Sequence, residues 1–132
     1  MYNIGLNKVI TLVRGDTFSY DYELNLGAII YRFPYKMKEG DYLYFAICEP
    51  NQPFEEAVVK KRYDYTSCEE REITNQFDET ETYYFVDIKL SSEDTVNLTE
   101  GKYYYTIKLL IKKDGEDYDV ITTQPKTLFY LV

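Results

Sequence analysis

The sequence predicts an all-β fold, an antiparallel β-sandwich of about eight or nine strands. Three observations support this prediction. Apolar and polar residues alternate with a period of two over most of the chain. Turn-forming residues interrupt the alternation at short intervals. Sixteen of the 132 residues are Tyr and seven are Phe, which suit half-buried sheet faces. No linker or repeat divides the chain, so residues 1–132 are expected to form one domain.

The alternating segments define the expected strands. They are residues 8–13, 18–24, 28–33, 41–49, 57–65, 83–90, 101–113, 117–123 and 127–132. Turns are expected at residues 14–16 and 39–41, and the Asp114-Gly115 pair predicts a hairpin with a type I′ turn. Residues 91–94 carry an N-cap pattern, which predicts at most one helical turn near residues 91–97. Residues 66–81 are polar and aperiodic, which predicts a long connection or an edge hairpin.

The segment around Tyr103 predicts which kind of sandwich the chain forms. In immunoglobulin-like sandwiches, a Tyr near the start of a late strand covers the preceding corner and bonds to the backbone upstream. Here Tyr103 has that place, Gly101 permits the tight corner, and Leu98 is expected to close the end of the core. Tyr105 falls where an antibody domain has a Cys, so no inter-sheet disulfide is expected. The alternative is an ordinary strand that follows a Gly turn.

Several short segments together carry a family resemblance. Residues 14–18 (RGDTF) follow the first expected strand, and Asp94-Thr95, Leu98, Gly101 and the run 103–109 come late, before the Asp-Gly hairpin and a short closing strand. This pattern, from about residue 9 to residue 132, resembles the small immunoglobulin-like domains of tailed-bacteriophage virion proteins. It is similar in particular to the N-terminal domain of baseplate upper proteins and to related fibre and tail accessory proteins.

The resemblance implies an assembly module that attaches a fibre or a receptor-binding part to a baseplate or capsid. The implied partners are other virion proteins or further copies of the chain in a homo-oligomer. The implied location is the virion, after synthesis in the bacterial cytoplasm.

Composition and charge exclude several partners and compartments. The net charge of −8 predicts a surface that repels phosphate backbones, so nucleic acid is not an expected partner. No segment approaches the ~18 consecutive apolar residues of a membrane span, and residues 1–12 lack the apolar core of a signal peptide. Cys48 and Cys68 are expected to be free thiols in a reducing compartment, with a single disulfide as the alternative.

The residues available for chemistry do not favour an enzyme, a metal site or a cofactor. The chain has no His, so the common nucleophile pairs cannot form and the commonest zinc ligand is missing. Three motifs could carry chemistry in principle, and each has a simpler explanation as solvated surface or turn. They are the acidic groups Glu69, Glu70, Glu72, Asp78, Glu79 and Glu81 for glycoside hydrolysis, the loose calcium pattern Asp114, Glu116, Asp117 and Asp119, and the adhesion tripeptide Arg14-Gly15-Asp16.

The Tyr surplus is the feature most suited to function. Tyr42 and Tyr44 alternate with the core residues of one expected strand, and Tyr104 and Leu110 do so on another. If these strands are neighbours, the four residues form an exposed aromatic patch of the kind that marks interfaces. The alternative is Tyr pairing that only stiffens the sheet. The sequence therefore favours a non-catalytic virion structural protein. A carbohydrate-binding module that uses the tyrosine face is the second hypothesis, and a small hydrolase is the third.

Overall fold

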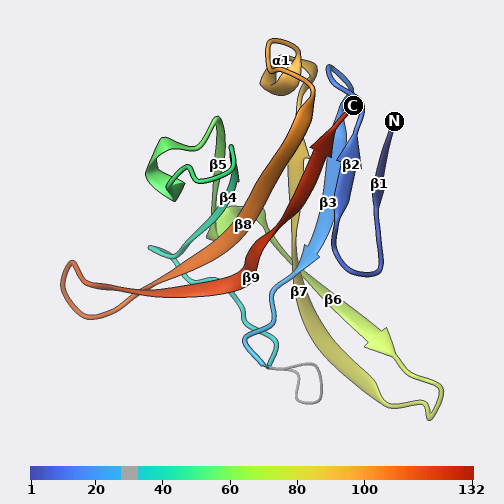
Figure 1. The fold of residues 1–132 in the computed structure, drawn as a ribbon. Helices are drawn as coiled ribbons and strands as arrows, with labels where there is room; N and C mark the ends of the chain where they lie inside the picture. Colours follow the sequence, from blue (N-terminus) through green and yellow to red (C-terminus); the bar gives the residue numbers. More distant parts are fainter. Residues whose placement is uncertain (28–32) are drawn as a thin grey trace.

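A computed structural model describes residues 1–27 and 33–132, which form two β-sheets that face each other (Figure 1). The strands are β1 (Tyr2–Ile4), β2 (Ile10–Leu12), β3 (Phe18–Glu23), β4 (Tyr42–Cys48), β5 (Val59–Asp64), β6 (Cys68–Thr74), β7 (Thr80–Leu90), β8 (Gly101–Lys112) and β9 (Tyr118–Leu131). The helical residues in the described ranges form one α-turn, α1 (Ser92–Thr95), and two 3-10 turns, η1 (Phe54–Glu56) and η2 (Tyr65–Ser67). The predicted all-β sandwich is thus confirmed.

The strand order is that of an immunoglobulin-like sandwich. The larger sheet has the order β1-β2-β9-β8-β4-β5, and the smaller has the order β3-β7-β6. If β3 to β9 are lettered B, C, C′, D, E, F and G, the sheets contain G-F-C-C′ and B-E-D, as in variable-type domains. One pair departs from the expected antiparallel pattern, because β2 runs parallel to β9 with Ile10 opposite Phe129.

The core lies between the sheets and follows the alternation of the strands. On β4, Leu43, Phe45 and Ile47 are fully buried, and on β8 Ile107 and Leu109 are equally buried. The small sheet adds its own row of buried side chains. They are Phe18, Tyr20, Tyr22, Val86, Ile88 and Leu90. Since strand side chains point to opposite faces in turn, the residues between these positions must face outward.

The predicted tyrosine corner is present. Tyr103 is buried, and its hydroxyl donates a hydrogen bond to the carbonyl oxygen of Thr99 at 2.6 Å. Gly101 has a φ of 152°, a conformation that residues with a Cβ rarely adopt. Leu98 packs against the core cluster at this end. Tyr105 is buried two residues later and donates to the carbonyl oxygen of Lys8 at 2.6 Å.

Some element boundaries differ from the prediction. β1 was not predicted, and the strand predicted over residues 28–33 lies, apart from Phe33, outside the described residues. The two strands predicted on either side of Pro125 are one strand, β9. A bulge accommodates Pro125, because Tyr105 pairs with Thr127 while Ile107 pairs with Gln124.

Two hairpins project from the sandwich (Figure 1). Residues 66–81 hold η2, β6 and the turn into β7, so the edge-hairpin alternative is confirmed. The β8–β9 hairpin is also present, but its turn is wider than type I′. The amide of Lys113 donates to the carbonyl oxygen of Asp117, and Gly115 has a positive φ whereas Asp114 does not.

The turn α1 is fixed by Asp94, which lies in the predicted N-cap segment. The backbone N–H of Ser91 donates to Oδ2 of Asp94 at 2.7 Å, and Nζ of Lys61 on β5 lies 2.8 Å from Oδ1. Partial burial opposes ionisation of Asp94, but the bonds from Lys61 and Ser91 outweigh it and lower the pKa of the carboxyl. Asp94 therefore joins α1 to the edge strand of the larger sheet.

We expect Tyr103→Phe to lower the free energy of unfolding by about 1 kcal/mol, the usual net value of one part-buried hydrogen bond. The ring stays in place, so the fold should be kept. Urea denaturation followed by circular dichroism measures the change, with Tyr130→Phe, at an exposed position of β9, as the control. Equal stability of the Tyr103→Phe variant and the wild type would contradict a stabilising corner.

We expect Asp94→Asn to destabilise the protein by about 1 kcal/mol at pH 7 and by nearly nothing near pH 2. The folded state lowers the pKa of Asp94, so the unfolded state takes up this proton at the higher pH. The contribution is present above the unfolded pKa of about 4 and is lost as the pH falls through the folded value. Thermal melts between pH 2 and 7 check this, and a pH-independent difference between variant and wild type would refute it.

Candidate functional site

The outer face of the larger sheet holds the four residues predicted as an interface. β4 and β8 are neighbours, as the patch requires, and Tyr42 lies directly opposite Leu110. Tyr44 lies opposite Lys108, and Tyr104 lies opposite Cys48 at the other end of β4. All four predicted residues are half-buried. They therefore share one face, but Tyr104 is separated from the two β4 tyrosines.

A fourth aromatic ring, that of Phe54, lies between them. It belongs to η1, which follows β4, and its ring meets that of Tyr44 edge-on with the centroids 6.2 Å apart. Pro53 precedes η1 in an extended conformation that leads the chain into this turn. Phe54 thus extends the aromatic surface from Tyr44 towards Tyr104.

Five cations lie over these rings. Lys60 is 4.4 Å from the ring centroid of Phe54, and Lys108 is 4.5 Å from the same centroid. Lys126 is 4.6 Å from the centroid of Tyr104. Two further contacts, at 4.8 and 5.6 Å, join Arg62 to Tyr42 and Lys102 to Tyr104. The electron-rich faces of the rings attract these cations.

We call this surface the basic–aromatic face. It comprises Tyr42, Tyr44, Phe54, Tyr104, Lys60, Arg62, Lys102, Lys108 and Lys126. Within residues 1–27 and 33–132, no carboxylate lies within ion-pair distance of any of the five cations. The face therefore carries five cations that are not bound in ion pairs, on a protein whose net charge is −8.

A hollow lies within the basic–aromatic face. Its lining comes from β4, η1, β8 and β9 and comprises Cys48, Gln52, Phe54, Tyr104, Tyr105, Thr106, Lys108 and Lys126. Phe54 and Tyr104 contribute aromatic rings to this lining, its charged groups are Lys108 and Lys126, and it contains no carboxylate. The arrangement can accept an apolar group whose flanks are acidic, but it offers no acid–base pair for hydrolysis.

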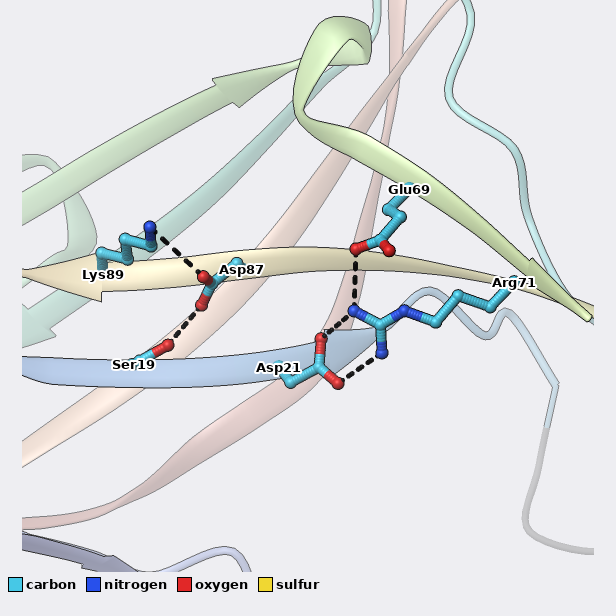
Figure 2. A network of polar contacts seen from close by, with 6 residues as sticks. All are labelled: Ser19, Asp21, Glu69, Arg71, Asp87 and Lys89. Atoms are coloured by element: carbon cyan, nitrogen blue, oxygen red, sulfur yellow. Dashed lines mark hydrogen bonds and ion pairs between the residues drawn. The ribbon is translucent and has the colours of Figure 1, made fainter. Parts of the chain in front are cut away.

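On the outer face of the smaller sheet, in contrast, the cations form ion pairs with carboxylates (Figure 2). Arg71 on β6 reaches across β7 and makes two bonds to Asp21 on β3, at 2.6 and 2.9 Å, and a third to Glu69 at 2.8 Å. These bonds raise the pKa of Arg71, and Arg71 lowers that of Glu69. Asp87 accepts a hydrogen bond from Ser19 and lies 3.5 Å from Lys89. Here each cation is paired with a carboxylate.

The residues of the other motifs considered from the sequence either do not converge on a site or make contacts within the chain. The six acids considered for hydrolysis lie exposed on the β6–β7 hairpin. No group of three or more potential metal ligands converges in the described part of the chain, the acids of the β8–β9 hairpin included. In the tripeptide at residues 14–16, the amide of Gly15 donates to Thr95 and Asp16 pairs with the amino group of Met1.

Both cysteines are free, as predicted, since Cys48 is on β4 and Cys68 is on β6 of the other sheet. Burial raises the pKa of each thiol. The positive charges of Lys126, Lys60 and Lys108 act on Cys48 in the opposite direction, but burial outweighs them. Neither thiol is therefore activated as a nucleophile.

Sequence reasoning missed Phe54 and the cations. Phe54 follows a predicted loop and stands outside any periodic segment, so nothing local places it over β4. A signal for the lysines was present, because Lys102 and Lys108 alternate with the core residues of β8 just as Tyr104 does. Lys60 and Lys126 come from other strands, and only the sheet order brings them to the same face.

The chain was compared with protein-family models, with curated proteins and with solved structures, and none of them matches it. The resemblance to phage virion domains thus remains a prediction from the sequence. Within the described residues, no helix has the length and apolar character needed to cross a bilayer.

We expect both thiols to react more slowly with iodoacetamide in the folded protein than in urea. The thiolate is the reactive form, and burial shifts its formation to higher pH. The pH–rate profile of the native protein should therefore rise above the ordinary thiol pKa of about 8.5. Mass spectrometry of labelled Cys48 and Cys68 peptides measures this, and fast native labelling of Cys48 near pH 7 would contradict it.

Proposed function

We propose that this chain is a non-catalytic structural protein of a phage or prophage virion, and that it acts through protein–protein contacts. The observation that carries the proposal is the basic–aromatic face. Half-exposed Tyr rings and an Arg on one sheet face are typical of protein interfaces, where such residues contribute most of the binding energy. The virion location rests on the resemblance in the sequence alone.

The carbohydrate-binding alternative is less well supported. A sugar ring stacks on an open aromatic face, but cations already lie over Tyr42, Tyr44 and Tyr104. A neutral sugar placed beside these cations would gain no charge interaction from them, whereas an acidic protein surface would. A hydrolase is also poorly supported, because the hollow in this face is lined by lysines rather than by paired carboxylates.

We expect the chain to be a stoichiometric component of phage particles from a strain that encodes it. Particles purified on a density gradient and analysed by quantitative mass spectrometry test this directly. Particles with a full set of tail and capsid proteins but without this chain would refute the virion assignment.

Variants show whether the face makes the contact. Tyr42→Ala combined with Tyr104→Ala should reduce incorporation at least about tenfold, because central aromatic residues are common hot spots. The matched control is Tyr65→Ala, since Tyr65 is exposed in η2 and is outside the basic–aromatic face. Incorporation of the double variant at the wild-type level, with the fold intact by circular dichroism, would exclude this face as the binding surface.

A further inference from the structure

The β6–β7 hairpin is exposed and acidic, so its charge is opposite to that of the basic–aromatic face. Residues 72–81 are all exposed, and the hairpin extends away from the sandwich (Figure 1). Residues 68–81 of this hairpin carry six acids, namely Glu69, Glu70, Glu72, Asp78, Glu79 and Glu81, and Arg71 is the one cation of that segment. Arg71 is already bound to Asp21 and Glu69. It therefore does not neutralise the carboxylates nearer the tip of the hairpin.

The tip of this hairpin also carries an apolar group. Phe77 is 71% exposed, although burial of such a ring is strongly favourable. Asn75 holds the turn, because its side-chain oxygen accepts hydrogen bonds from the amides of Phe77 and Glu79 at 2.8 and 3.1 Å. The ring of Phe77 is thus presented on an ordered turn, with Asp78 and Glu79 directly beside it.

The hollow in the basic–aromatic face complements this tip in both respects. The rings of Phe54 and Tyr104 offer apolar walls, and Lys108 and Lys126 offer positive charge at the same place. A buried apolar anchor gives an interface its affinity, and complementary charges around the anchor fix the position of one partner on the other.

We propose that the β6–β7 hairpin of one copy docks on the basic–aromatic face of a second copy, with Phe77 in the hollow and Asp78 and Glu79 against Lys108 and Lys126. The proposal rests on the assembly function above and names a partner for its face. The hairpin belongs to the smaller sheet and the face to the larger one, so the contact joins unlike surfaces of two copies. A contact of this kind continues into a ring or a filament.

Sedimentation velocity of the purified full chain tests the proposal. At concentrations up to about 100 μM, the wild type should associate in about 50 mM NaCl. Its dissociation constant should be at least about tenfold higher in about 500 mM NaCl, because salt screens exposed charges. Phe77→Ser and the double variant Lys108→Gln/Lys126→Gln should each sediment as monomers. The matched controls, Leu6→Ser at an exposed apolar position and Lys36→Gln/Lys38→Gln with the same change in charge, should associate like wild type.

A mixing experiment tests the pairing of unlike surfaces. Phe77→Ser keeps an intact face, and the double lysine variant keeps an intact hairpin, so an equimolar mixture should form a dimer of one copy of each and nothing larger. Wild type that stays monomeric at low salt would overturn the proposal, as would a mixture that stays monomeric or variants that associate normally.

A foreign partner would give a different result. If monomeric wild type binds poly-L-glutamate and the double lysine variant does not, the face belongs to another acidic protein and the self-association proposal is wrong. Detection of the chain in phage particles is a separate measurement, so either proposal can fail while the other holds.

Discussion

Four aromatic rings join the two sheets, and the rest of the sandwich depends on their contact. Phe18 comes from the smaller sheet, and Phe45, Tyr105 and Phe129 come from three adjacent strands of the larger one. Their centroids form a closed cycle with spacings of 5.6 to 6.5 Å. Because Phe45 and Tyr105 must point inward, strand alternation forces their neighbours Tyr44 and Tyr104 to the outer face. Lys108 lies on that face for the same reason, since it stands between the buried Ile107 and Leu109. The core thereby determines the composition of the surface that we propose as the binding face.

The same rings replace the covalent link of an antibody domain. There, a Trp on strand C packs against a disulfide between strands B and F. In this chain Phe45 on strand C packs against Tyr105 on strand F, with 5.6 Å between centroids, and both cysteines are free. Burial of large rings supplies the cohesion that the disulfide supplies elsewhere, since each ring buries roughly 150–250 Å². Stability of this kind does not depend on an oxidising compartment.

Sequence patterns predicted the parts of the fold that depend on residues close together in the chain. Alternation located the central strands, and the corner at Tyr103 and the turn at Ser91–Asp94 followed from short motifs. The passage of β9 through Pro125 was missed, because the bulge is set by pairing with β8 rather than by the Pro itself. For the same reason, only the tyrosines of the candidate site were predicted, and its cations were not. Its tyrosines follow from alternation within a strand, but Lys60 and Lys126 reach them only through the order of β5, β4, β8 and β9.

The contrast between the two outer faces explains why only one of them is suited to bind an acidic surface. Exposed ion pairs contribute little to stability, so neither arrangement is needed to hold the fold. Arg71 would have to give up Asp21 and Glu69 before it could bind a new carboxylate. Lys108 and Lys126 would give up nothing, because a cation over a ring can accept a carboxylate from the solvent side and keep the ring contact. The cost of rearrangement is therefore lower on the larger sheet, where no existing ion pair has to be broken before a carboxylate can bind.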